Sequence, residues 1–180
     1  FHSTRVSDIA DEAGVAYGLV YHYFKSKDEV LNELFSERWS LLLAAIDEAD
    51  RTQPTPRDKL AAVATFIIDS YRYDPDLMKV IVVEVTRAAN SFGRTHLDEI
   101  NQAYEKIAKI VADAQAAGEF RDDIDPLFAS MWFYGAIEQL LSGWVFELIP
   151  SQEADFERAK QLVVETICGG LEPRPGAARD

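Results

Sequence analysis

Residues Gly14 to Lys27 read GVAYGLVYHYFKSK, and this stretch decides the fold of the N-terminal part of the chain. Just before it, the apolar residues at positions 6, 9, 10 and 13 have the spacing of one side of a short helix. Gly14 follows, and glycine ends a helix readily because it tolerates positive φ. A second short helix is predicted from about residue 16 to residue 23, with Val20 and Phe24 facing inward. Two short helices with a glycine-containing turn indicate a helix-turn-helix, whose second helix lies in the major groove of DNA.

Three runs in this region follow a recognisable pattern: TRVSDIA at 4–10, AGV at 13–15 and YHYFKSKDEVL at 21–31. They resemble the DNA-binding head of TetR-family transcriptional repressors. The resemblance implies that base edges face Tyr17, Gly18, Leu19 and His22. It further implies phosphate or backbone contacts for Tyr21 and Lys25, and it adds Thr4 and Arg5 to the DNA-binding set. In the family one more helix precedes the helix-turn-helix, and this sequence begins in what would be the connecting loop.

Two details of the second short helix bear on how it binds DNA. The expected N-cap is Ala16, where the family has Ser or Thr, and the lost cap costs about 1 kcal/mol. Leu19 can contact only apolar groups on DNA, such as a thymine methyl. An alternative role for Tyr21, Tyr23 and Phe24 is to form the core of the head. The first short helix is expected to begin with Thr4 as its N-cap.

The net charge of −13 is unusual for a DNA-binding protein, but it is unevenly distributed. Residues 1–27 contain three basic and three acidic residues, which leaves 15 basic and 28 acidic residues for the rest. The acidic remainder is therefore not expected to contact phosphates, and two heads are expected to act together. The single cysteine, Cys168, allows no intrachain disulfide, and no signal-peptide pattern occurs at the N-terminus. Both observations favour a cytoplasmic protein.

Helices are predicted along the whole chain, so the fold class is all-α. Ser26 caps a connector helix that reaches about residue 49, and TQPTP at 52–56 ends it. We therefore expect a DNA-binding head with its connector at 1–50 and an effector-binding and dimerisation body at 51–180. Body helices are expected at 57–74, from Pro75 through the β-branched run 79–87, at 97–118, 127–148 and 154–169, with a loop at 90–95.

The predicted helix at 127–148, capped by Asp125, is apolar on nearly every side. It contains Glu138 and has no Lys or Arg at its ends, which argues against a membrane span. A helix outside a membrane that is apolar all round must be covered on every side, so a second copy of the chain is expected to cover one face. In the TetR family the last two helices pair with their mates in a four-helix bundle. The expected dimer interface is Phe133, Ile137, Leu141, Trp144, Phe156, Val163 and Ile167.

The resemblance also implies that the body encloses a small hydrophobic effector that releases the DNA. The candidate pocket residues are Phe66, Tyr71, Val83, Arg87, Phe92, Tyr104, Phe128 and Trp132. Each of them could instead belong to the plain core, and Arg87 could either pair with Glu84 or receive a carboxylate or phosphate. Three body stretches, VEVTR at 83–87, GEFR with DDIDP at 118–126, and LSGWV at 141–145, resemble TetR-family regulators of fatty-acid metabolism. This second resemblance implies a fatty-acyl-CoA effector.

Catalysis finds little support in the sequence. The chain has three histidines and lacks a nucleophile elbow, a phosphate-binding loop and paired cysteines with metal-ligand spacing. We therefore expect no enzymatic activity, no cofactor and no metal. The function predicted is a homodimeric repressor that binds a near-palindromic double-stranded operator. The alternative is a small helical enzyme or hydrophobic-ligand carrier whose head is vestigial.

Overall fold

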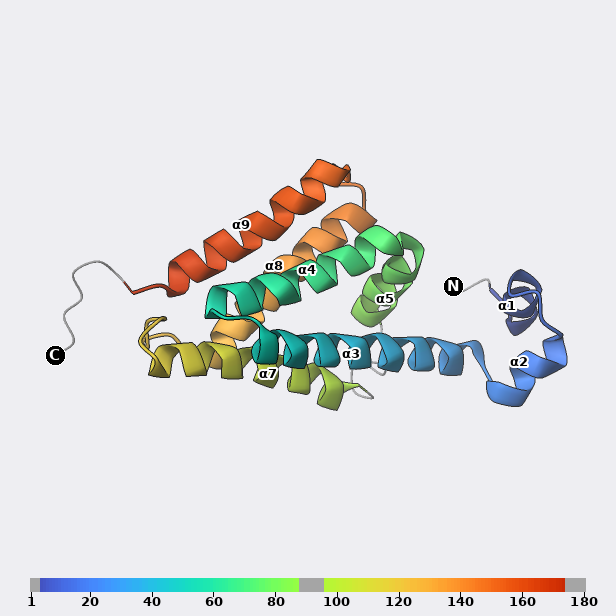
Figure 1. The fold of residues 1–180 in the computed structure, drawn as a ribbon. Coiled ribbons are helices and arrows are strands. Elements are labelled where there is room, and N and C mark those ends of the chain that lie inside the picture. The colour runs from blue at the N-terminus through green and yellow to red at the C-terminus, as the bar shows by residue number, and fades with distance from the viewer. Residues whose placement is uncertain (1–3, 88–95, 174–180) are drawn as a thin grey trace. The chain divides into compact units, whose positions relative to one another are not determined.

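The structure is a computed structural model that describes residues 4–87 and 96–173, and these described residues form helices and their connections (Figure 1). The all-α prediction is confirmed. The helices are α1 (Val6–Glu12), α2 (Tyr17–Tyr23), α3 (Lys27–Thr52), α4 (Pro56–Tyr73), α5 (Pro75–Arg87), α7 (Leu97–Ala116), α8 (Pro126–Val145) and α9 (Glu153–Leu171). Two compact units are formed by residues 1–40 and 41–180, so the division falls within α3 and not at its end. The loop predicted at 90–95 lies outside the described residues.

The head is a pair of short helices around a small core. Val6, Ala10 and Val20 are buried together, and Phe24 packs against them. Gly14 has φ of +65°, a conformation that favours glycine, and it allows the chain to turn sharply between α1 and α2. The turn is closed by the Val15 N–H, which donates to the Ala10 carbonyl at 3.0 Å. The predicted helix-turn-helix is therefore present.

The caps of the head helices differ in one respect from expectation. The N-cap of α1 is Arg5 and not Thr4, and the Arg5 backbone N–H donates to the Asp8 carboxylate at 2.7 Å. This is the half of a capping box in which the carboxylate at the third helical position accepts from the backbone N–H of the N-cap residue, and it fixes the helix start at Arg5. At α2 the expectation holds, because Ala16 is the N-cap and no side chain caps the helix.

The connector helix α3 begins as the sequence predicts. Ser26 Oγ accepts a hydrogen bond from the Glu29 N–H at 3.1 Å, and the Glu29 carboxylate accepts one from the Lys25 N–H at 2.6 Å. Its buried side chains recur at intervals of three or four residues, as one covered side of a helix requires: Leu31, Phe35, Trp39, Leu42, Ile46 and Ala49. Phe35 and Trp39 stack on each other with ring centroids 5.1 Å apart.

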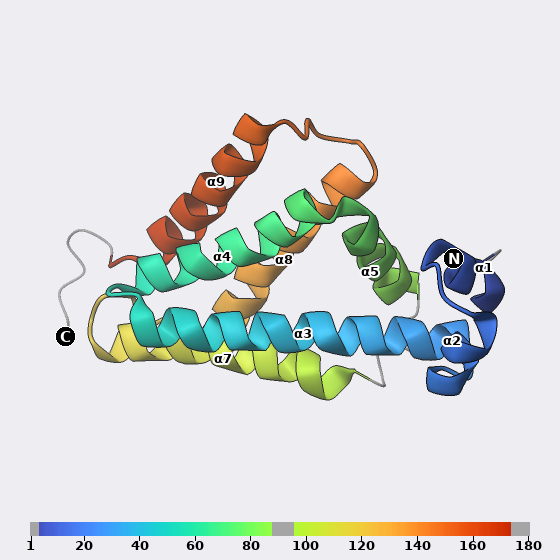
Figure 2. The same cartoon turned by 45° about the vertical axis from the view of Figure 1, so that its right-hand side comes forward.

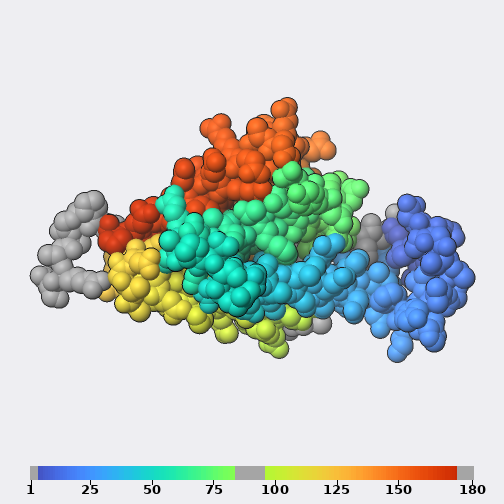
Figure 3. Space-filling view, viewed as in Figure 1, coloured from blue at the N-terminus to red at the C-terminus, as the bar shows by residue number. Residues whose placement is uncertain are grey.

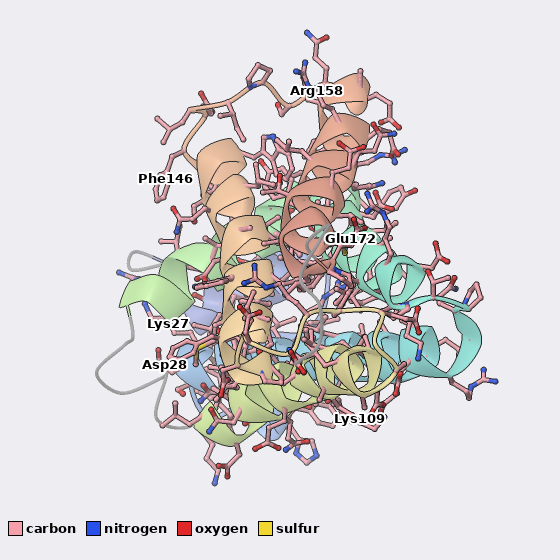
Figure 4. The ribbon with its side chains drawn as sticks, turned by 90° about the vertical axis from the view of Figure 1, so that its left-hand side faces the viewer. Lys27, Asp28, Lys109, Phe146, Arg158 and Glu172 are labelled. Atoms are coloured by element: carbon pink, nitrogen blue, oxygen red, sulfur yellow. The ribbon has the colours of Figure 1, made fainter. Side chains whose placement is uncertain are left out.

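The C-terminal part of α3 is tied to two body helices by a group of ion pairs, which we call the α3 ion-pair group. Asp50 pairs with Lys59 of α4 at 2.8 Å and with Lys109 of α7 at 3.2 Å. Asp47 pairs with Lys106 of α7. Figure 4 shows Lys109 on α7 in side-chain detail. These contacts place the end of the connector against both α4 and α7.

The body helices pack mainly in two pairs, α7 with α8 and α4 with α9 (Figure 2). The α4 and α9 helices also lie side by side on the face seen in Figure 3. The core of α4 consists of Leu60, Val63, Ala64, Ile67 and Ile68. The β-branched run within 79–87 forms the helix α5, because the described part of the chain offers it no partner strand.

One side of α8 is buried and the other is exposed, although both are apolar. Asp125 caps the helix, since its carboxylate accepts from the Leu127 and Phe128 N–H groups at 2.8 and 3.1 Å. The helix ends at Val145, three residues before the predicted end, and Glu147 follows with φ of 56°. No described helix is both long enough and apolar enough to cross a membrane.

Candidate functional site

The side chains proposed to face DNA form the outer side of α2. Tyr17 is 52% exposed, Leu19 47% and Tyr21 44%, and Gly18 and His22 are also exposed, whereas Val20 is buried beneath them. The helix therefore has one inner side that builds the head and one outer side that is free to contact a ligand. This is the arrangement that a recognition helix needs in order to present side chains to base edges.

Aromatic contacts organise the outer side of α2. The Tyr17 and Tyr21 rings lie 4.6 Å apart, one helical turn from each other, and the hydrogen bond with Tyr21 raises the pKa of Tyr17. His22 meets the Tyr23 ring edge-on at 5.1 Å. Tyr23 is 67% exposed, so the alternative role in the core is wrong for this residue and for Tyr21, while half-buried Phe24 does pack against the core.

The remaining residues proposed to contact DNA lie at the ends of the two short helices. Arg5 and Lys25 are exposed, at the start of α1 and just after α2, while Thr4 is half-buried. Arg5 and Lys25 carry positive charge, so they suit phosphate contacts. All the proposed DNA-facing residues on and after α2 are thus solvent-accessible on one short segment of the chain.

In the body, Tyr71 belongs to an aromatic cluster that joins α4, α8 and α9. The Tyr71 ring stacks on Trp144 at 5.5 Å and lies 6.1 Å from Phe156, and Trp144 meets Phe156 at 4.8 Å. The Trp144 indole N–H donates to the Pro150 carbonyl at 2.9 Å, so its polar atom is satisfied. Burial, with Glu147 and Asp76 nearby, raises the pKa of Tyr71. This cluster holds the three helices together.

A second group of polar side chains lies between α7 and α8. The rings of Tyr104 and Tyr134 meet edge-on at 5.6 Å. Burial raises the pKa of both phenols and of Glu138, one helical turn after Tyr134, and the Glu138 carboxyl raises both phenol pKa values further. A carboxyl and two phenols therefore lie close together between α7 and α8.

The structure divides the candidate pocket residues into three groups. Phe66, Val83 and Tyr104 are half-buried, as residues that line a binding site would be. Tyr71 is buried in the aromatic cluster. Phe128 and Trp132 are each 60% exposed on the outer side of α8, so their assignment to an interior pocket is wrong. The Arg87 side chain and all of Phe92 lie outside the described residues.

The residues chosen for the dimer interface lie mainly in the core of their own chain. Phe133, Ile137, Leu141, Trp144, Phe156 and Val163 are each at most 6% exposed, and only Ile167 is half-buried. Side chains already covered by their own chain cannot be the face that a second copy covers. The large apolar side chains that remain open on these two helices are Leu127, Phe128, Met131 and Trp132 on α8 and Leu162 on α9.

The first four of these define the outer α8 face, Leu127, Phe128, Met131 and Trp132. These residues are one, three, four or five positions apart from one another, which places them on one side of a helix. This spacing could be seen in the sequence. What the sequence did not indicate was which of the two sides of α8 the chain itself covers.

An exposed recognition helix on a helix-turn-helix head, joined through α3 to a separate helical body, defines a DNA-binding transcription regulator. Comparison with known proteins gives the family. Residues 1–34 match the domain described as bacterial regulatory proteins of the tetR family, and residues 56–167 match the tetracyclin repressor-like C-terminal domain. The chain therefore belongs to the TetR family of transcription regulators. This membership decides against the enzyme alternative, since the family is not enzymatic.

Two proteins from Bacillus subtilis and Bacillus halodurans illustrate what the whole chain is similar to. The fatty acid metabolism regulator protein of Bacillus subtilis is 29% identical over 172 residues, which cover 95% of this chain and 87% of the relative. The crystal structure of the regulator FadR from Bacillus subtilis in complex with stearoyl-CoA superposes with a TM-score of 0.83 at 25% identity, covering 95% and 90% of the two chains. FadR from Bacillus halodurans shares the fold, with a TM-score of 0.85, 22% identity and coverage of 96% and 88%.

Proposed function

We propose that this chain is a homodimeric repressor whose binding to a near-palindromic operator is released by a fatty-acyl-CoA held in the body. The observation that carries the effector class is the similarity to the Bacillus subtilis regulator over 95% of the chain, which includes the body and not only the head. The solved FadR with stearoyl-CoA supports it, because that body superposes on this one.

The chemistry of the α7–α8 pair is compatible with this effector class. Tyr104 and Tyr134 supply phenol groups and Glu138 supplies a carboxyl. The same two helices also bury aliphatic side chains, among them Ile107 and Ile137. An acyl chain needs apolar walls, and its thioester needs only a few polar contacts. The effector acts by binding more tightly to the body conformation in which the heads no longer fit the operator.

The dimer proposed here uses the outer α8 face together with Leu162 of α9. The four residues of that face are 43–60% exposed and Leu162 is 56% exposed. Large apolar side chains gathered on the exposed face of one helix mark an interaction site on a monomer. Figure 4 shows a further aromatic side chain, Phe146, pointing outward at the C-terminal end of α8.

A titration with stearoyl-CoA tests the effector. At about 100 times its dissociation constant, the ligand stabilises the folded chain by about 2.7 kcal/mol, which raises Tm by about 5–10 °C for a chain of this size. The same concentrations should abolish the gel shift of the operator. Stearate and free CoA serve as controls and should do neither at equal concentration. If stearoyl-CoA leaves both Tm and the gel shift unchanged, the proposed effector is wrong.

A pair of tyrosine variants locates the effector within the body. Tyr104→Ala should raise the stearoyl-CoA concentration needed for release by on the order of tenfold, because an aromatic wall is lost. Tyr73→Ala removes a 75% exposed tyrosine of α4 and should leave that concentration unchanged. Circular dichroism of both variants without ligand checks that they are folded. Equal release of both variants and of the parent would contradict the position of the site.

A further inference from the structure

The recognition helix lacks the residues that usually read bases by paired hydrogen bonds. Arg and Lys form such pairs with guanine, and Asn and Gln with adenine. None of these four residue types occurs in α2, which reads YGLVYHY. Two of its polar side chains, Tyr17 and Tyr21, are engaged with each other. Sequence readout by α2 therefore depends more than usual on shape and on apolar contact.

Leu19 is the residue of α2 that offers an apolar contact. Its side chain is 47% exposed, while the core of the head is made by Val6, Ala10 and Val20 with Phe24. An exposed leucine contributes little to the fold of such a small domain. In the major groove the C5-methyl of thymine is the apolar group on the base edges. Leu19 and a thymine methyl are thus complementary.

Gly18, beside Leu19, is a glycine that the fold of the head does not require. A Cβ added there would meet no atom within 4 Å, and its φ lies outside the left-handed region. Glycine inside a helix lowers helix stability, so alanine would be the more stabilising residue at this position. The absence of a side chain at position 18 would, however, allow another molecule to approach the α2 backbone closely.

We propose that Leu19 reads a thymine in each operator half-site through its C5-methyl group, and that Gly18 lets α2 come close enough for this contact. The inference rests on DNA binding by the head and is independent of the effector. It names the feature of the operator that the protein recognises: a thymine opposite Leu19 whose methyl is buried on binding.

The test begins with an operator selected by the intact protein from a pool of random duplexes. Each thymine of the selected half-site is then replaced by deoxyuridine, which removes only the methyl group. At one thymine position, replacement by deoxyuridine in a single half-site should lower the affinity about fourfold. This is the loss expected when the burial of one methyl group is removed. The same replacement in both half-sites should lower the affinity about fifteenfold. Leu19→Ala removes the same contact from both heads, so it should bind the thymine operator at least about fifteenfold more weakly. It should show no further loss with deoxyuridine at that position.

Matched variants separate this contact from general effects. Leu41→Ala removes a leucine of similar exposure, 45%, from α3 and should keep the full response to deoxyuridine. Gly18→Ala should bind the operator at least tenfold more weakly while its Tm stays the same or rises, because alanine favours the helix.

Three results would overturn the proposal. The first is a parent protein that responds to no thymine-to-deoxyuridine change, and the second is a Leu19→Ala variant that keeps the same response. The third is a Gly18→Ala variant that binds the operator as tightly as the parent does, because this would show that α2 does not need a glycine in order to approach the DNA. If selection recovers no duplex at all, DNA binding itself fails, and this outcome is distinct from the loss of the methyl effect.

Discussion

Replacing Trp132 by alanine is expected to weaken the dimer without destabilising the folded chain. Trp132 is 60% exposed on the outer α8 face, and a tryptophan side chain offers up to about 250 Å² of surface. Covering half of the exposed part in each of two copies removes about 150 Å² from water, worth about 4 kcal/mol per dimer at about 25 cal/mol/Å². The dissociation constant of the dimer should therefore rise about a thousandfold.

Sedimentation equilibrium over a concentration series measures this constant directly, since the chain has a mass of 20.2 kDa. Trp144→Phe is the matched control. Trp144 is 3% exposed and donates a hydrogen bond to the Pro150 carbonyl, so its loss should cost about 1 kcal/mol of unfolding free energy. The dimer constant of this control should not change.

Two results would refute the reasoning about the outer α8 face. One is a Trp132→Ala protein that sediments with the dimer constant of the parent. The other is a Trp144→Phe protein that remains folded but dissociates, because this would show that the buried side of α8 supports the dimer.

Three further predictions concern single polar side chains. Lys25→Gln should reduce the slope of log affinity against log salt by about 1.8 for a dimer, one phosphate contact being lost per head; an unchanged slope would remove Lys25 from the DNA interface. The hydrogen bond from Lys59, with Lys109 nearby, holds the pKa of Asp50 below its ordinary value of 3.8. The stabilisation is therefore complete above that value and lost as the pH falls through the lower folded-state pKa. In urea unfolding, Asp50→Asn should be less stable than the parent at pH 7, and the difference should vanish in acid; a constant difference would contradict the ion-pair origin. Asp125→Ala should cost about 1 kcal/mol through the lost cap of α8, or about 2–4 °C in Tm, whereas exposed Asp122→Ala should not; equal Tm values for both variants would argue against the cap.

The head could be predicted closely from the sequence because its structure depends on short-range signals. Gly14 ends a helix, Ser26 caps another, and the apolar positions around them follow the helical repeat. The predicted N-cap of α1 was wrong by one residue, at Arg5 and not Thr4, because the Asp8 carboxylate binds the Arg5 backbone N–H and so fixes the helix start there. The outward-facing residues of α2 could also be predicted from short-range signals, because the position of the apolar Val20 fixes which side of this short helix faces inward.

The two faces of α8 were exchanged in the sequence-based prediction. Phe133 and Trp144 were placed between two copies, and Phe128 and Trp132 were placed inside the body, whereas the structure buries the first pair and exposes the second. Both faces are equally apolar, so hydrophobic periodicity does not say which one the chain itself covers. That choice is made by residues distant in sequence, such as Tyr71 of α4.

The α3 ion-pair group limits how strongly the proposed effector can act on DNA binding through the polar contacts between α7 and α3. Asp47 and Asp50 each hold one lysine of α7 at the protein surface, and an exposed ion pair contributes at most about 1 kcal/mol. These two ion pairs can therefore contribute at most about 2 kcal/mol to the coupling free energy between a displacement of α7 and DNA binding. A coupling free energy of this size corresponds to about a thirtyfold change in DNA affinity. A larger response requires the apolar side of the same helix segment, at Leu42 and Ile46, to move as well.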